Sequence, residues 1–102
     1  MPQENLFEVS MELVHDGFSQ FKNIRTELNN FMINLNYSHR AGSRGQQVHH
    51  LYIALAHLDN VEKGIRISDA NEEIIRLEKI YDKIRSLKKM ILEYIKHLTT
   101  GV

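Results

Sequence analysis

The sequence predicts an all-α protein, folded as a single up-and-down antiparallel bundle of three or four helices over residues 1–102. One observation is that Pro2 is the sole proline and that five glycines occur among 102 residues, which permits long helices. Another is that apolar residues recur at spacings of three and four, whereas a half-buried strand would alternate every second residue. Finally, the content of 42% hydrophobic residues suits one core in one domain of this length.

The first apolar stripe covers about residues 5–37 and repeats every seven residues, at Phe7, Val14, Phe21, Leu28 and Leu35. Two interpretations are open. A single long helix with a weak point at Asp16-Gly17 is slightly favoured by the continuous phase, because an interior glycine costs only about 1 kcal/mol. The other is a short first helix that ends at this point. Asn5, three residues before Glu8, predicts the N-cap of the first helix.

A loop is predicted at residues 38–45, where two glycines and two serines interrupt the helical pattern. Ser43 and Gln46 predict a capping box for the next helix, which spans about residues 46–66. Its apolar stripe consists of Val48, Leu51, Ala54, Leu55, Leu58, Val61 and Ile65. Because the connection is short, we expect this helix to run antiparallel to the one before it.

The last helix is predicted at about residues 70–99, with a capping box at Asp69 and Glu72 and a glycine C-cap at Gly101. It carries the strongest heptad of the chain: Leu77, Ile84, Ile91 and Leu98 recur every seven residues. These four positions form the seam of a left-handed bundle or of an oligomer. Long first and last helices would project past the shorter helix at 46–66 and expose apolar surface, which predicts self-association or a partner helix.

The formal net charge of zero is distributed in alternating blocks. Residues 1–20 carry a charge of −4, residues 21–50 carry +3, residues 51–78 carry −3 and residues 79–102 carry +4. Such blocks either neutralise each other between antiparallel helices or leave one basic and one acidic face. This pattern argues against a uniformly basic nucleic-acid binder and leaves a patterned one open.

Several classes of protein are excluded or disfavoured by composition. The absence of cysteine excludes a disulfide framework, thiolate chemistry and a cysteine-ligated zinc site. No run of about 18 uncharged apolar residues occurs, so we expect no membrane span. Glu4 and Glu8 stand where a secretory signal would be basic, so we expect a cytoplasmic protein. No glycine loop for phosphate and no paired carboxylates stand out, and we expect no cofactor.

Histidines supply the first candidates for chemistry. His39, His49, His50 and His57 lack a third ligand at helical spacing, so exposed or half-buried imidazoles are favoured over a metal site. Arg44 followed by His49, His50 and Tyr52 is similar to the motif of HEPN-type ribonucleases. In that reading the arginine would hold the scissile phosphate and a histidine would move the proton of the 2′-hydroxyl.

Basic residues supply the second set of candidates. The predicted nucleic-acid contacts are Arg40, Arg44, Lys83, Lys88 and Lys89. A basic helical face can bind a phosphate backbone by releasing counterions. The alternative for the last helix is a solvated face whose lysines pair with Glu78, Asp82 and Glu93 at spacings of three or four.

The segment at about residues 34–66 resembles a known family. Leu35-Asn36-Tyr37-Ser38 leads into Ala41-Gly42-Ser43, and the next helix reads Leu51-Tyr52-Ile53-Ala54-Leu55, followed by Leu58 and Val61-Glu62. This pattern is similar to the four-helix-bundle proteins encoded by intervening sequences in large-subunit ribosomal RNA genes, and to the Avd accessory proteins of diversity-generating retroelements. The resemblance implies a bundle that self-associates into a ring-like oligomer and binds RNA or a reverse transcriptase.

Three hypotheses about function follow, in order of preference. The first is a non-enzymatic accessory protein that self-associates and contacts RNA or a partner that processes nucleic acid. The second is a protein–protein interaction adaptor without a nucleic-acid role. The third is a HEPN-like ribonuclease.

Overall fold

The computed structural model describes the backbone of residues 2–20, 24–68 and 74–100, and the side chains of residues 6–15, 24–65 and 78–100. Within these ranges the chain forms four helices, α1 (Pro2–Gln20), α2 (Arg25–Arg40), α3 (Arg44–Ser68) and α4 (Ile74–Thr99). No strand occurs in these ranges, so the predicted all-α class is confirmed. None of the described helices combines the length and the hydropathy needed to cross a membrane.

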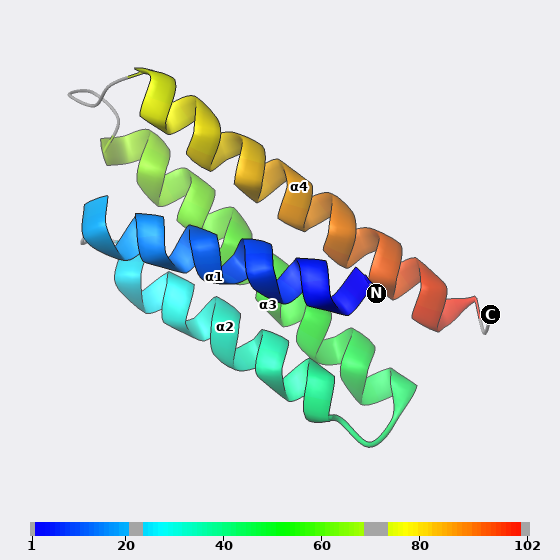
Figure 1. Cartoon of the computed structure of the whole chain (residues 1–102). Helices are drawn as coiled ribbons and strands as arrows, with labels where there is room; N and C mark the ends of the chain where they lie inside the picture. The colour runs from blue at the N-terminus through cyan, green and yellow to red at the C-terminus, as the bar shows by residue number, and fades with distance from the viewer. Residues whose placement is uncertain (1, 21–23, 69–73, 101–102) are drawn as a thin grey trace.

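The four helices form an up-and-down bundle (Figure 1). Each helix runs antiparallel to the one before it, and α4 returns alongside α1. The bundle measures 45 × 21 × 18 Å, and its most extensive helix contact is between α2 and α3. The α2–α3 hairpin is therefore the best-packed unit of the fold.

The segment at residues 5–37 folds as two helices, so the favoured interpretation of one long helix is wrong. The alternative boundary is wrong as well, because α1 continues through Gly17 to Gln20. A single helix of that span would be about 50 Å long, which exceeds the 45 Å length of the bundle. Leu28 and Leu35 of the predicted stripe are buried, but on α1 the buried residues are Leu6 and Leu13, one position before the predicted Phe7 and Val14. Phe7 and Val14 are half-buried against the core, and Phe21 lies outside the described residues. The buried phase therefore shifts between α1 and α2.

The remaining boundaries are close to those predicted. The loop is shorter than expected, since α3 begins at Arg44. The backbone N–H of Gln46 donates to Oγ of Ser43 at 3.2 Å, which confirms that half of the capping box. Asn5 lies inside α1, so its predicted N-cap is wrong, and Pro2 occupies the helix start that proline favours. The predicted caps at Asp69, Glu72 and Gly101 lie outside the described residues.

The predicted overhang of long outer helices is not formed. α3 has 25 residues and α4 has 26, whereas α2 has 16. The helix expected to be short is thus as long as the last helix, because it extends at both ends beyond residues 46–66.

The heptad of the last helix lies in the core of the bundle. Ile84 and Ile91 are fully buried, and Leu98 is half-buried and packs against the core. The side chain of Leu77 lies outside the described residues. Burial of each large apolar side chain contributes about 1.5–3 kcal/mol, so these positions hold the single chain together and Ile84 and Ile91 are not free to form an oligomer contact.

Candidate functional site

The candidate site lies at the tip of the α2–α3 hairpin. α2 ends at Arg40 because Ala41 takes an extended conformation, with φ −62° and ψ 141°. Ser43 then caps α3 through its contact with Gln46. This short connection brings the last turn of α2 against the first turns of α3, so side chains from both helices meet there.

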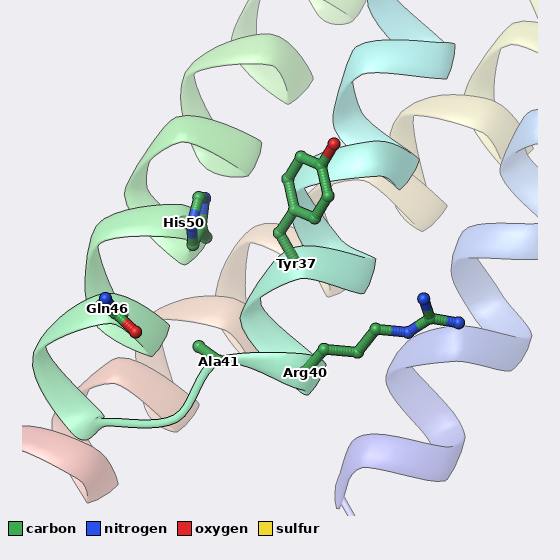
Figure 2. Close-up of a pocket in the computed structure, with 5 residues that line it drawn as sticks. All are labelled: Tyr37, Arg40, Ala41, Gln46 and His50. Atoms are coloured by element: carbon green, nitrogen blue, oxygen red, sulfur yellow. The ribbon is translucent and has the colours of Figure 1, made fainter.

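A shallow hollow of about 390 Å³ lies between these two helix ends and is open to solvent. It is lined by Tyr37, Arg40, Ala41, Gln46 and His50 (Figure 2). The rings of Tyr37 and His50 lie 5.4 Å apart at an angle of 54°, and Tyr37 is 55% exposed. Nδ1 of His50 is buried without a hydrogen-bond partner among the described residues. In Figure 2 the guanidinium of Arg40 points away from α3.

The hairpin around this hollow is free of acidic residues. No Asp or Glu occurs from residue 28 to residue 58, whereas Arg40, Arg44 and four histidines do. Arg40 lies in the last turn of α2, where the helix dipole stabilises a positively charged side chain. Arg44 opens α3, whose first turn contains no acid, so the positive end of that dipole is not offset. We call Tyr37, Arg40, Arg44, Gln46 and His50 the hairpin tip.

Lys88 has a different role from the one predicted. Its Nζ lies 2.6 Å from Oδ1 of Asp59 and 2.9 Å from Oε2 of Glu62, which joins α4 to α3. Burial alone would lower the pKa of Lys88, but the hydrogen bonds to Asp59 and Glu62 outweigh it, so the pKa is raised. The positive charge of Lys88 is therefore used inside the bundle.

The five predicted basic residues do not share one face. Lys83 lies on the opposite flank of α4 from Lys88, since its Nζ is 3.7 Å from Oε2 of Glu12 on α1. Lys89 is exposed on the outside of α4. Arg44 precedes Asp59, the partner of Lys88, by fifteen residues, which is about 22 Å along a helix axis. Arg40 and Arg44 stand at the two ends of the short connection between α2 and α3, and the three lysines lie elsewhere on α4.

The four residues of the ribonuclease-like motif do not converge within one chain. His50 faces Tyr37 on α2, and the ring of His49 contacts that of His50 at 5.4 Å. Tyr52 is two positions further along, so it points roughly 160° away from His50, and it is 53% exposed. Arg44 stands at the start of the same helix.

One polar contact between α2 and α3 was not predicted from the sequence. Nδ1 of His57 lies 2.6 Å from Oε2 of Glu27, and Asn60 donates to the same carboxylate oxygen at 3.4 Å. This cluster links α2 to α3 at the far end of the hairpin from the tip. The sequence offered one indication of this contact, because Glu27 is the one acidic residue among residues 21–50. Among the described residues, no three histidines or carboxylates lie close enough to hold a metal ion.

A second feature lies on the outer side of α3 and α4. Tyr52 precedes Asp59 by seven residues, and Leu92 follows Lys88 by four, so each lies on the same side of its helix as the Lys88–Asp59 pair. Because the helices are antiparallel, both residues are displaced in the same direction from that pair. Tyr52 and Leu92 are 53% and 50% exposed, so two apolar side chains are left uncovered on this side of the bundle, and we refer to them as the exposed pair.

Known proteins give no further guide to the site. No known protein family matches the chain, and no curated protein or solved structure is significantly similar to it. The features that bear on function are therefore the geometry of the hairpin tip and of the outer α3–α4 surface.

Proposed function

We propose that this protein is a non-enzymatic binding module that contacts RNA through the hairpin tip. The observation that carries the proposal is the absence of acidic residues from 28 to 58 around the exposed Arg40 and Arg44. Arginines and the positive end of a helix dipole both attract phosphate. The exposed ring of Tyr37 adds an aromatic surface of the kind on which unpaired RNA bases stack. The family resemblance of residues 34–66 supports the same proposal.

Self-association is part of the proposal. Two arginines neutralise about two phosphates, which gives modest affinity with a shallow salt dependence. Several copies on one RNA would raise the overall affinity without new contacts. The exposed pair Tyr52 and Leu92 supports such assembly, because it leaves apolar surface uncovered on the side of the bundle formed by α3 and α4.

The test of RNA binding compares two charge-matched variants. Arg40→Ala/Arg44→Ala removes two positive charges from the hairpin tip, and Lys63→Ala/Lys79→Ala removes two exposed charges elsewhere. We expect the first variant to bind single-stranded RNA roughly tenfold or more weakly at 100 mM salt, and the second to bind as the wild type does. Absence of binding at 50 mM salt, or an equal loss in both variants, would contradict the proposal.

A protein–protein adaptor is the second candidate function, and the exposed pair Tyr52 and Leu92 favours it. Light scattering after size exclusion gives the mass in solution. We expect a mass above the 12.0 kDa of one chain, and a return toward that mass in Tyr52→Ser/Leu92→Ser. A 12.0 kDa particle at all concentrations would contradict self-association. An oligomer without RNA affinity would leave the adaptor as the function.

The non-enzymatic character has its own test. Labelled RNA incubated with the protein is expected to stay intact. Cleavage that disappears in His49→Ala and His50→Ala would contradict this expectation and favour the HEPN-like ribonuclease instead.

A further inference from the structure

We infer that the hollow at the hairpin tip accepts one unpaired nucleotide, with its base on the exposed face of Tyr37 and its phosphate beside Arg40. The inference deepens the proposed function and rests on it. It names the chemical group that the site selects: a heteroaromatic ring joined to an anion, not the phosphate backbone alone.

The size and openness of the hollow fit this ligand. Its volume of about 390 Å³ lies near the lower end of the range for small-molecule sites, roughly 300–1,000 Å³. Because the hollow is open to solvent, a nucleotide that is still joined to its neighbours can enter from the side. A closed pocket would admit only a free nucleotide.

The aromatic wall favours a base. Tyr37 belongs to a helix whose other large aromatic residue, Phe31, is fully buried, yet the ring of Tyr37 is 55% exposed. The imidazole of His50 is tilted by 54° against this ring and does not stack flat on it, and the ring itself lines the hollow. A base that stacks there would cover apolar surface that the bundle leaves in water.

The polar wall favours the hydrogen-bonding edge of a base. Gln46 and His50 are four residues apart on α3 and therefore lie on the same side of the helix, opposite Tyr37 (Figure 2). The amide of Gln46 offers one acceptor and two donors, a set that can pair with the edge of any base. Nδ1 of His50 has no partner among the described residues. A turn of the imidazole toward a bound base would satisfy this nitrogen, which is costly to leave unpaired.

The cation completes the match. Arg40 is exposed and lines the hollow next to Tyr37. Its guanidinium points away from α3 in Figure 2, and its long side chain can turn to meet a phosphate on either side of the bound base. A simple anion would not stack on the ring of Tyr37, and an apolar peptide would not pair with the charge of Arg40. A nucleotide can make both contacts.

The test separates the base from the backbone. Binding of the full chain to a ten-nucleotide single-stranded RNA is compared with binding to an abasic ten-mer of the same charge. We expect Tyr37→Leu to weaken binding of the RNA by roughly five- to 150-fold and to leave the abasic strand unchanged. Tyr37→Phe keeps the ring and is expected to bind as the wild type does. Ile33→Ala removes an exposed apolar side chain from the same helix outside the tip and serves as the control.

A fluorescent base gives a direct readout of stacking. An RNA with one 2-aminopurine is expected to lose fluorescence on binding to the wild type, and to lose less on binding to Tyr37→Leu. Circular dichroism verifies that each variant remains helical.

The outcomes distinguish the two proposals. If Arg40→Ala/Arg44→Ala weakens binding but Tyr37→Leu does not, the nucleotide site is overturned and the RNA-binding function stands. Equal affinity of the wild type for the RNA and for the abasic strand would overturn the nucleotide site as well. If neither strand binds at 50 mM salt, both proposals fall.

Discussion

The hairpin tip and the Lys88 pair use basic residues in opposite ways. Lys88 lies between Asp59 and Glu62 and joins α4 to α3, so its charge stabilises the bundle. Arg40 and Arg44 lie in a hairpin without acidic residues from 28 to 58, so their charges face solvent. A basic residue that lies within reach of carboxylates on a neighbouring helix stabilises the fold. A basic residue in a segment without acidic residues remains available to a ligand. This difference separates the basic residues that the sequence placed in one group.

The largest loss of stability is expected from a substitution in the core that supports both regions. Phe31, on α2, is fully buried in the core of the bundle. We expect Phe31→Ala to lower the free energy of unfolding by about 3–5 kcal/mol, because it leaves a cavity. Urea unfolding followed by circular dichroism measures this loss. The control Ile33→Ala, at a position that is 46% exposed on the same helix, is expected to cost less than about 1 kcal/mol.

The second prediction is that substitutions in the two regions have opposite effects on stability and on RNA affinity. Lys88→Ala leaves Asp59 and Glu62 without their cation and is expected to cost about 1–2 kcal/mol of stability, since partial exposure screens the pair. RNA affinity is expected to stay unchanged. Arg40→Ala/Arg44→Ala is expected to do the reverse, with lower RNA affinity and little change in unfolding. A variant that loses both properties would remove the distinction between structural and ligand-binding bases.

The third prediction concerns how the stabilisation of the bundle by Lys88 depends on pH. The folded state raises its pKa above the ordinary value of 10.5. The stabilisation is therefore fully present below pH 10.5 and is lost as the pH rises through the higher pKa of the folded state. Urea unfolding of the wild type and Lys88→Ala should differ by a constant amount from neutral pH to about pH 9, and the two should converge above pH 10.5. A difference that disappears near neutral pH would contradict this assignment.

The smallest expected effect concerns the backbone of the tip. Gly45 lies in the first turn of α3, and a Cβ there would meet no atom within 4 Å. Gly45→Ala is expected to stabilise the protein by about 0.5–1 kcal/mol, because alanine restricts the unfolded chain and favours helix. RNA affinity is expected to stay at the wild-type level. Weaker RNA binding in this variant would indicate that the ligand approaches the backbone at Gly45.

Much of the fold was predictable because it depends on local pattern. The seven-residue repeat identified Ile84 and Ile91 as core positions, and both are fully buried. Ser43 was recognisable as a cap because its partner is three residues away. The break between α1 and α2 was not predictable from the apolar spacing, because Phe7 and Val14 extend the repeat of Leu28 and Leu35 although the buried residues of α1 are Leu6 and Leu13. The limit was the length of the bundle, which is a property of all four helices.

The candidate site was predictable in part. Arg40, Arg44 and His50 were identified from residue type alone, and they lie at the hairpin tip. Tyr37 and Gln46 had no chemical signal of their own, because the hollow exists only when the end of α2 meets the start of α3. The structural role of Lys88 likewise depends on a contact between helices, because its partner Glu62 on α3 is 26 residues away along the chain.

Spacing and residue type act over one or two helical turns, so the amino-acid sequence alone specifies the helical class, the buried positions of α2 to α4 and the acid-free segment from residue 28 to residue 58. Tertiary structure alone decided where the first stripe folds back, which bases are neutralised and which side chains line the hollow. These outcomes depend on contacts between helices, where a carboxylate or an aromatic ring from a distant segment determines whether a charge is used inside the bundle or left for a ligand.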